Sequence, residues 1–209
     1  MVAIYGLQGH AYKTWEHENG SLWLRDFLPA DVPFARIFAF GYESAVAFSN
    51  SVAKLEGKAH DLLSRLSAER KSDGAAKDER PIVFICHSLG SIILKKALIL
   101  AHERSSDLDL QDFLISTEGV AFLGVPHAGS SSASCADFAA NVLKTASLGR
   151  STNTALVSDL RKDSGTLSNI TTDSVDRLRD LKIYTLFERK RYHGILVRYL
   201  RADHAHCCC

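Results

Sequence analysis

The feature that most constrains the fold is a serine between a short apolar run and a long helical segment. The run from Ile82 to Cys86 is apolar and rich in β-branched residues, and the segment after Gly90 is strongly helical in pattern. Ser88 therefore lies at the apex of a predicted strand-turn-helix unit. So sharp a turn lifts the serine hydroxyl above the carboxyl edge of a sheet, as in a nucleophile elbow. A buried junction whose serine only caps the helix is the alternative.

Small residues flank this serine at the two positions where strand and helix must approach closely. They are Cys86 and Gly90, so the pattern is C-x-S-x-G rather than G-x-S-x-G. The turn would also aim amides of the helix N-terminus, including that of Leu89, at a developing oxyanion. His87, directly before the serine, is expected to support the site.

Length and composition indicate one globular domain. The chain has 209 residues, 46% of them apolar, with 25 basic and 24 acidic residues. This balance favours neither nucleic acid nor an acidic membrane as a partner. The apolar run from Ile92 to Ala101 is interrupted by two lysines and is too short to cross a bilayer. Because residues 1–6 lack the features of a signal peptide, we expect an intracellular, cytoplasmic protein.

The cysteines do not form a disulfide framework. There are five, and Cys207, Cys208 and Cys209 end the chain. The histidines beside them lack the ligand spacing of a structural zinc site, and S-acylation of the tail is a second alternative. We expect a domain over residues 1–200, a disordered tail over 201–209, and no metal or cofactor.

Strand and helix patterns alternate along the chain, which predicts an α/β fold with a mostly parallel sheet covered on both faces. Polar breaks are expected at Lys71–Arg80 and Ser105–Leu110. The predicted strands are Val2–Tyr5, Ala35–Phe40, Ile82–Cys86, Gly119–Val125, Leu181–Phe187 and Ile195–Leu200. The predicted helices are 21–28, 44–70, the segment after Gly90, 135–145, 154–162 and a short one within 174–180.

Several sequence blocks in a fixed order carry a family resemblance. They are Gly6-Leu-Gln-Gly-His10, Trp23-Leu-Arg-Asp-Phe-Leu-Pro29, Ala35 to Tyr42, Ile85-Cys-His-Ser-Leu-Gly90 and Phe122-Leu-Gly-Val-Pro-His-Ala-Gly-Ser130. Across residues 2–188 the chain resembles the α/β-hydrolase superfamily. Within it, the likeness is to lipase-like serine esterases related to the serine-active-site-containing proteins and to fungal NACHT- and ankyrin-associated hydrolase domains.

The resemblance implies a three-layer α/β-hydrolase fold, with a sheet truncated at its edges. It also implies a serine hydrolase that cleaves a small acyl ester or a lipid through an acyl-enzyme on Ser88. Association with an organelle and peripheral contact with a membrane are compatible with it.

By the same resemblance, the oxyanion hole takes its amides from Leu7 and Leu89. Gly6 and Gly9 let the backbone of the first loop pass close to a substrate. The family usually has a histidine where this chain has Tyr5. An ordinary turn is the alternative for this loop.

A triad in the order serine, acid, histidine needs two further residues downstream of Ser88. Glu188 is the candidate acid because it ends a predicted strand, although pairing with a neighbouring basic residue would also explain it. His204 is the candidate base because it follows the last apolar run. His127 is expected to support the site as a loop histidine, and His193 and His206 are weaker candidates for the base.

The chain departs from the family after the candidate acid. Only fifteen residues separate Glu188 from His204, and six separate Glu188 from the last apolar run at Ile195. A crossover to another parallel strand needs a dozen residues or more. Either the last strand pairs in another way, or the base cannot reach Ser88. The second function class is therefore a catalytically silent hydrolase fold used for binding or signalling.

Overall fold

Within the described residues, six strands form one sheet, and five of them run parallel. The computed structural model describes residues 1–7, 9–43, 52–72, 80–124, 164–190 and 195–201. The strand order is β2-β1-β3-β4-β5-β6, with β6 antiparallel to β5. This arrangement confirms the predicted, mostly parallel α/β sheet. The strands are β1 (Val2–Ile4), β2 (Phe38–Phe40), β3 (Ile82–His87), β4 (Thr117–Leu123), β5 (Lys182–Lys190) and β6 (Ile195–Arg201).

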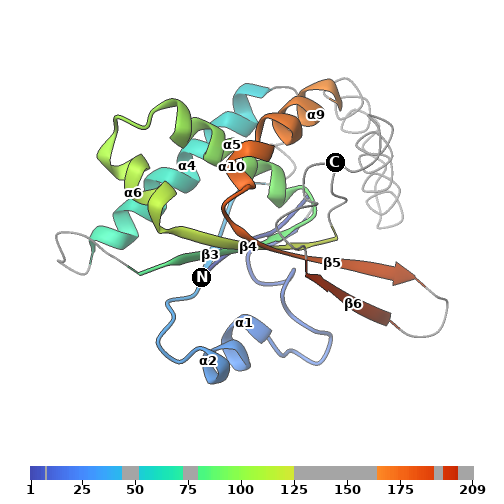
Figure 1. Ribbon diagram of the computed structural model, residues 1–209. Coiled ribbons are helices and arrows are strands. Elements are labelled where there is room, and N and C mark those ends of the chain that lie inside the picture. The colour runs from blue at the N-terminus through green and yellow to red at the C-terminus, as the bar shows by residue number, and fades with distance from the viewer. Residues whose placement is uncertain (8, 44–51, 73–79, 125–163, 191–194, 202–209) are drawn as a thin grey trace.

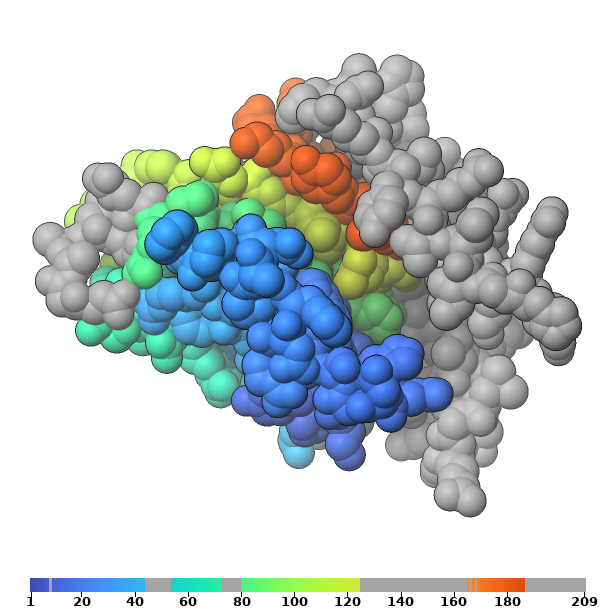
Figure 2. All heavy atoms as spheres, turned by 90° about the horizontal axis from the view of Figure 1, so that it is seen from below, coloured from blue at the N-terminus to red at the C-terminus, as the bar shows by residue number. Residues whose placement is uncertain are grey.

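Helices lie on both faces of the sheet and complete three layers (Figure 1). One face carries α4 (Val52–Lys71), α5 (Gly90–Glu103), α6 (Leu108–Ser116), α9 (Ser164–Asp173) and α10 (Val175–Leu178). The other face carries α1 (Trp23–Asp26) and α2 (Leu28–Asp31), and Figure 2 shows the N-terminal segment lying over it. No helix in the described part of the chain is long and apolar enough to cross a membrane.

The alternation of side chains along the strands divides the core in two. Successive residues of a strand point to opposite faces of a sheet. Ile4 and Phe84 accordingly belong to the large cluster beneath α4 and α5, whereas Ala3 and Ile85 belong to a smaller cluster around Trp15. Both faces of the central strands are therefore buried, as the apolar runs in the sequence predict.

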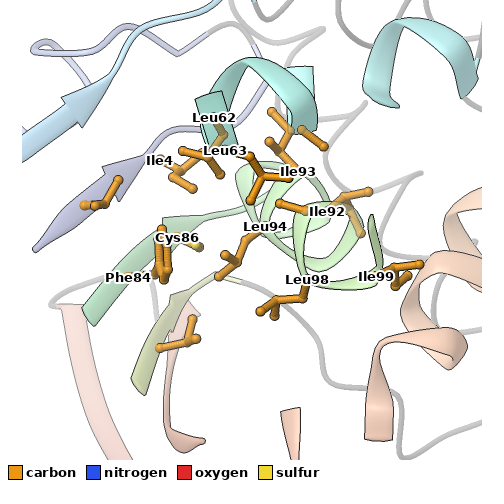
Figure 3. Close-up of a cluster of buried hydrophobic side chains, with 14 of the residues drawn as sticks. Ile4, Leu62, Leu63, Phe84, Cys86, Ile92, Ile93, Leu94, Leu98 and Ile99 are labelled. Carbon is orange, nitrogen blue, oxygen red and sulfur yellow. The ribbon is translucent and has the colours of Figure 1, made fainter. Parts of the chain in front are cut away.

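Helix α5 is the most deeply buried helix-forming segment of the described chain. Ile93, Leu94 and Leu98 are at most 1% exposed and pack with Phe84 of β3 (Figure 3). Lys95 interrupts this apolar run, yet it is only 2% exposed, with its ammonium 5.8 Å from the centroid of the Phe122 ring. A cation over an aromatic face is a favourable arrangement for a buried lysine.

Several predicted elements differ in their bounds from those observed. The helix predicted at 21–28 is two short helices, because Pro29 lies in the first turn of α2, where proline begins a helix. Strand β2 starts at Phe38 rather than Ala35. The polar break predicted at Ser105–Leu110 contains the start of α6, and α9 was not predicted. The helices predicted at 135–145 and 154–162 lie outside the described residues.

The direction of strand β6 explains how so short a connection can join it to β5. It pairs with β5 from Ile195 opposite Lys190 to Arg201 opposite Tyr184, in the antiparallel direction. An antiparallel neighbour needs only a hairpin-length connection rather than a crossover. The last strand therefore pairs in another way from the rest of the sheet, as one of the two alternatives supposed.

Candidate active site

Ser88 occupies a strained turn between β3 and α5. Its φ is +49°, and no other non-glycine residue in the described ranges has a positive φ. A serine is sterically strained in this left-handed region, and residues with such strained backbone conformations concentrate at functional sites. The predicted position of Ser88, on the turn after an interior strand, is confirmed.

Neighbouring elements hold this turn in place through the backbone of Ser88. Its amide donates to the carbonyl of Leu123 in β4 at 2.9 Å. Its carbonyl accepts from the amide of Ser91 at 3.1 Å and from the Ser91 hydroxyl at 2.8 Å. Because Ser91 is fully buried, these bonds are shielded from water. The strained conformation is thus fixed from both the sheet and the helix.

Gly90 lets α5 begin directly against the end of β1. A Cβ atom at Gly90 would lie 2.4 Å from the carbonyl oxygen of Tyr5 and 2.6 Å from that of Ile4. Both contacts are with backbone atoms, so no side chain can move aside to relieve them. This close approach brings the loop after β1 next to the serine.

Cys86 takes the other small position of the C-x-S-x-G pattern and is completely buried. Burial raises the pKa of its thiol far above the ordinary range, although the nearby Lys95 charge acts in the opposite direction. The thiol is therefore neutral at physiological pH. Cys86 fills space beneath the turn and is no nucleophile.

The loop after β1 passes directly alongside Ser88. A Cβ atom at Gly6 would lie 2.9 Å from the Ser88 Cβ and 3.2 Å from the Leu89 amide nitrogen. Among the described residues, the amides of Leu7 and Leu89 donate to no backbone carbonyl. The Leu89 amide adjoins the serine and Leu7 directly follows Gly6, so these two amides stay the predicted donors of an oxyanion hole.

The loop itself is a compact turn. The Gly9 amide donates to the Gly6 carbonyl at 3.2 Å. A Cβ atom at Gly9 would lie 2.7 Å from both the Thr14 hydroxyl oxygen and Cδ2 of the Tyr5 ring. Gly9 therefore allows the loop to fold back onto the residue that precedes Gly6.

His87 points to the face of the sheet opposite α5. Its ring packs edge-on against that of Trp15, with 6.3 Å between the centroids. On the same side, a Cβ atom at Gly124, which has a φ of +63°, would lie 4.0 Å from Nε2 of His87. His87 is exposed, so the imidazole lies at the surface beside Trp15, which belongs to the smaller core cluster.

The carboxyl ends of three strands meet at the edge where Ser88 lies. His87 pairs with Leu123, and Leu123 pairs with Leu186 of β5. Glu188 comes two residues after Leu186 and so lies at this edge, two strands from Ser88. The prediction that Glu188 ends the strand was wrong, because β5 continues to Lys190 through its pairing with β6.

The course of β6 bears on the candidate base. Its last residue, Arg201, faces Tyr184, which lies at the level of Ile85 in β3. At about 4.8 Å between strands and 3.3 Å per residue, the Arg201 backbone is roughly 17 Å from that of Ser88. The strand also runs toward the amino edge of the sheet. His204 and His127 both lie outside the described residues.

The sequence did not single out Tyr42, which contacts the loop after β1. Its hydroxyl donates to the Tyr5 carbonyl at 2.6 Å, and its amide donates to the Tyr5 hydroxyl at 2.9 Å. The available signals were its place at the end of the block Ala35 to Tyr42 and an aromatic residue two positions after a predicted strand. A contact across 37 positions leaves no periodic trace in a single sequence.

A pocket of about 310 Å³ lies away from the serine, at the amino ends of the central strands. It is lined by Val2, Phe38 and Ile82 together with Arg36 and Arg80, among others. Because these residues begin the strands whose far ends carry the Ser88 turn, this pocket is no part of the candidate site.

Known proteins similar to this chain include vertebrate SERAC1 proteins, whereas no protein-family model matches it. Protein SERAC1 of Danio rerio is 30% identical over 148 residues, which cover 62% of this chain and 22% of the relative. Protein SERAC1 of Mus musculus is 28% identical over 209 residues, which cover 89% of this chain and 29% of the relative. The chain thus spans less than a third of the length of these relatives.

Among solved structures, the mature form of the Bacillus licheniformis lipase BlEst2 has a similar fold. The TM-score is 0.50 at 22% sequence identity, and the match covers 88% of this chain and 63% of the lipase. This likeness confirms the predicted α/β-hydrolase-like fold. The chain is a distant homologue of the SERAC1 proteins and has an α/β-hydrolase-like fold.

Proposed function

We propose that the protein is a serine hydrolase that cleaves an acyl or lipid ester through an acyl-enzyme on Ser88. The observation that carries this proposal is the strained Ser88 turn, with the open amides of Leu7 and Leu89 beside it. Strain in a serine backbone and unused amide donors both cost stability, and an acyl-transfer site explains both.

In the proposed reaction, the Ser88 hydroxyl oxygen attacks the ester carbonyl and its proton passes to a general base. The carbonyl oxygen becomes an oxyanion that accepts from the amides of Leu7 and Leu89. Collapse of this intermediate expels the alcohol, which takes the proton from the base, and leaves the acyl group on Ser88. Water, activated by the same base, then releases the carboxylic acid and restores the serine.

His204 remains the predicted base and Glu188 the predicted acid that orients it. Glu188 is supported by its place at the same edge of the sheet as Ser88. For His204, the antiparallel course of β6 requires the chain beyond Arg201 to turn back toward that edge. His127 is the rival candidate, because it comes four residues after the end of β4 at the serine's own edge.

Esters with small or lipid-derived acyl groups are the proposed substrates. The likeness to a protein named as a lipase supports this class. The proposal includes no cofactor and no nucleic-acid partner.

The decisive experiment is labelling with a fluorophosphonate probe, in which the serine oxygen displaces fluoride from phosphorus. We expect the wild type to be labelled, Ser88→Ala to lose at least about 99% of the labelling, and Ser106→Ala to match the wild type. Ser106 is an exposed serine outside the site and serves as the matched control. Circular dichroism should show that all three proteins are folded. Equal labelling of wild type and Ser88→Ala contradicts the proposal.

The same probe distinguishes the two candidate bases. If His204 is the base, His204→Ala lowers the labelling rate by about 10³-fold or more while His127→Ala does not. The opposite result assigns His127. Folded wild type that shows no labelling supports the second function class, a silent binding or signalling module. The antiparallel β6 is the observation that favours this second class.

A further inference from the structure

Two tyrosines form a reciprocal contact at the entrance to the loop after β1. The Tyr42 hydroxyl donates to the Tyr5 carbonyl at 2.6 Å. The Tyr5 hydroxyl accepts from the Tyr42 amide at 2.9 Å and donates to the Tyr42 carbonyl. The two rings are stacked, with centroids 4.5 Å apart and planes 14° from parallel. Each tyrosine therefore satisfies backbone groups of the other.

The Tyr5 peptide is restrained from two further sides. Its carbonyl lies against the backbone of Gly90, where a Cβ atom would come within 2.4 Å. Its ring lies against Gly9, where a Cβ atom would come within 2.7 Å of Cδ2. The Tyr42 hydroxyl is thus the polar contact that fixes the Tyr5 carbonyl in a tightly packed environment.

This peptide sets the direction in which the chain leaves β1. Gly6 follows it directly and lies 2.9 Å, measured from an ideal Cβ, from the Cβ of Ser88. The Leu7 amide is the next donor along the chain. A shift of the Tyr5 peptide therefore moves this amide relative to the serine. Oxyanion donors act at about 2.7–3.1 Å from the oxyanion, so small displacements weaken them strongly.

We propose that Tyr42 is a positioning residue, whose hydroxyl holds the Tyr5 peptide so that the Leu7 amide faces the oxyanion formed beside Ser88. The catalytic part of this inference rests on the proposed hydrolase function. Its structural part, that the Tyr42 hydroxyl orders the loop, is independent of catalysis.

Burial favours the neutral form of Tyr42. It raises the pKa of the phenol far above the ordinary value, and the neighbouring Tyr5 and Cys86 act in the same direction. The hydroxyl consequently remains a hydrogen-bond donor at neutral pH and well above it.

A simple packing role is the competing explanation. Tyr42 is partly buried, contacts both core clusters and stacks against Phe40 with 5.6 Å between the ring centroids. Tyr42→Phe keeps the ring and these contacts and removes only the hydroxyl. This variant therefore separates the hydrogen bond from the packing.

The test measures kcat and KM for p-nitrophenyl butyrate and amide hydrogen exchange over residues 5–14. In Tyr42→Phe we expect kcat to fall about tenfold or more, KM to change less than about twofold, and exchange of the Gly9 amide, which donates to the Gly6 carbonyl within the loop, to accelerate. Tyr184→Phe is the matched control, because Tyr184 is a 49% exposed tyrosine on β5. Ile99→Val in α5 is a second control that lowers global stability without touching the loop.

Each outcome decides a part of the proposal. Unchanged exchange and unchanged kcat in Tyr42→Phe overturn it. The same changes in Ile99→Val overturn it as well, because they would reflect global stability. If the wild type shows no Ser88-dependent activity, the hydrolase proposal fails, and exchange alone then decides whether the hydroxyl orders the loop. Faster exchange in Tyr42→Phe but in neither control supports that ordering, and unchanged exchange refutes it.

Discussion

At the scale of single residues, replacing Gly90 by alanine adds a Cβ atom that has two opposing effects on stability. Alanine is the better helix former by about 1 kcal/mol, and Gly90 is the first residue of α5. Yet an added Cβ would lie 2.4 Å from the Tyr5 carbonyl oxygen, which belongs to the backbone directly after the interior strand β1. Overpacking of this kind costs about 1–3 kcal/mol, so the steric effect outweighs the gain in helix propensity.

We therefore expect Gly90→Ala to lower the free energy of unfolding by about 2 kcal/mol and to slow fluorophosphonate labelling of Ser88 by tenfold or more. Urea denaturation and labelling rates measure the two effects. Gly57→Ala in α4 is the matched control, because a Cβ there meets nothing within 4 Å. It should gain about 0.5–1 kcal/mol. A stabilised, fully labelled Gly90→Ala protein would show that β1 and α5 are not in close contact.

The buried thiol of Cys86 gives a second residue-level effect, on the pH dependence of stability. Burial raises its pKa in the folded protein far above the ordinary value of about 8.5 that it regains on unfolding. Above pH 8.5 the unfolded chain therefore releases a proton that the folded protein retains. Stability from this group is complete below about pH 8.5 and is lost as the pH rises further.

Between pH 7.5 and 9.5, we expect Cys86 to lower the free energy of unfolding by about 1 kcal/mol. Urea denaturation of wild type and Cys86→Ala at both pH values isolates this contribution, because all other groups are shared. The variant should lose less stability over this interval by that amount. Identical losses in the two proteins would mean that the thiol titrates normally in the folded state.

At the scale of the elements, the start of α6 shows how a polar segment contains a helix signal. The Asp107 side chain accepts from the amides of Asp109 at 2.9 Å and Leu110 at 3.4 Å, which is an N-cap. The sequence interpretation gave the whole of Ser105–Leu110 to a loop, because polar residues dominate it. The cap and the apolar residues after it, such as Phe113, were the overlooked signal.

We expect Asp107→Ala to lower the free energy of unfolding by about 1 kcal/mol, because two amides of the first turn lose their acceptor. Asp107→Asn keeps an oxygen acceptor and should retain most of the stability. Thermal or urea denaturation of both variants measures the difference. Equal losses would indicate that the charge, rather than the cap, is responsible.

The sequence limited the possible arrangements of β6 but did not decide between them. The six residues between Glu188 and Ile195 exclude a parallel crossover. They allow either a hairpin or a strand outside the sheet, because both satisfy the same apolar pattern. Only the pairing of Ile195 with Lys190 selects the hairpin.

At the scale of the whole molecule, the parallel sheet and the Ser88 turn were predictable because they depend on local patterns. Apolar runs separated by helical segments require coverage on both faces, and a strand that turns directly into a helix places its apex residue. Contacts across the chain were not predictable in this way. The Tyr5–Tyr42 pair joins segments 37 positions apart and depends on the strand order β2-β1-β3.

That strand order also determines at which point of synthesis each strand finds a neighbouring strand of the sheet already made. Strand β3 pairs with β1, and from β4 onward each strand pairs with the strand made immediately before it. Every described backbone contact of the serine turn, from Ile4 and Tyr5 to Leu123, is encoded before residue 124. The chain is made from its N-terminus, so every one of these partners of the Ser88 turn is translated before the predicted acid and base.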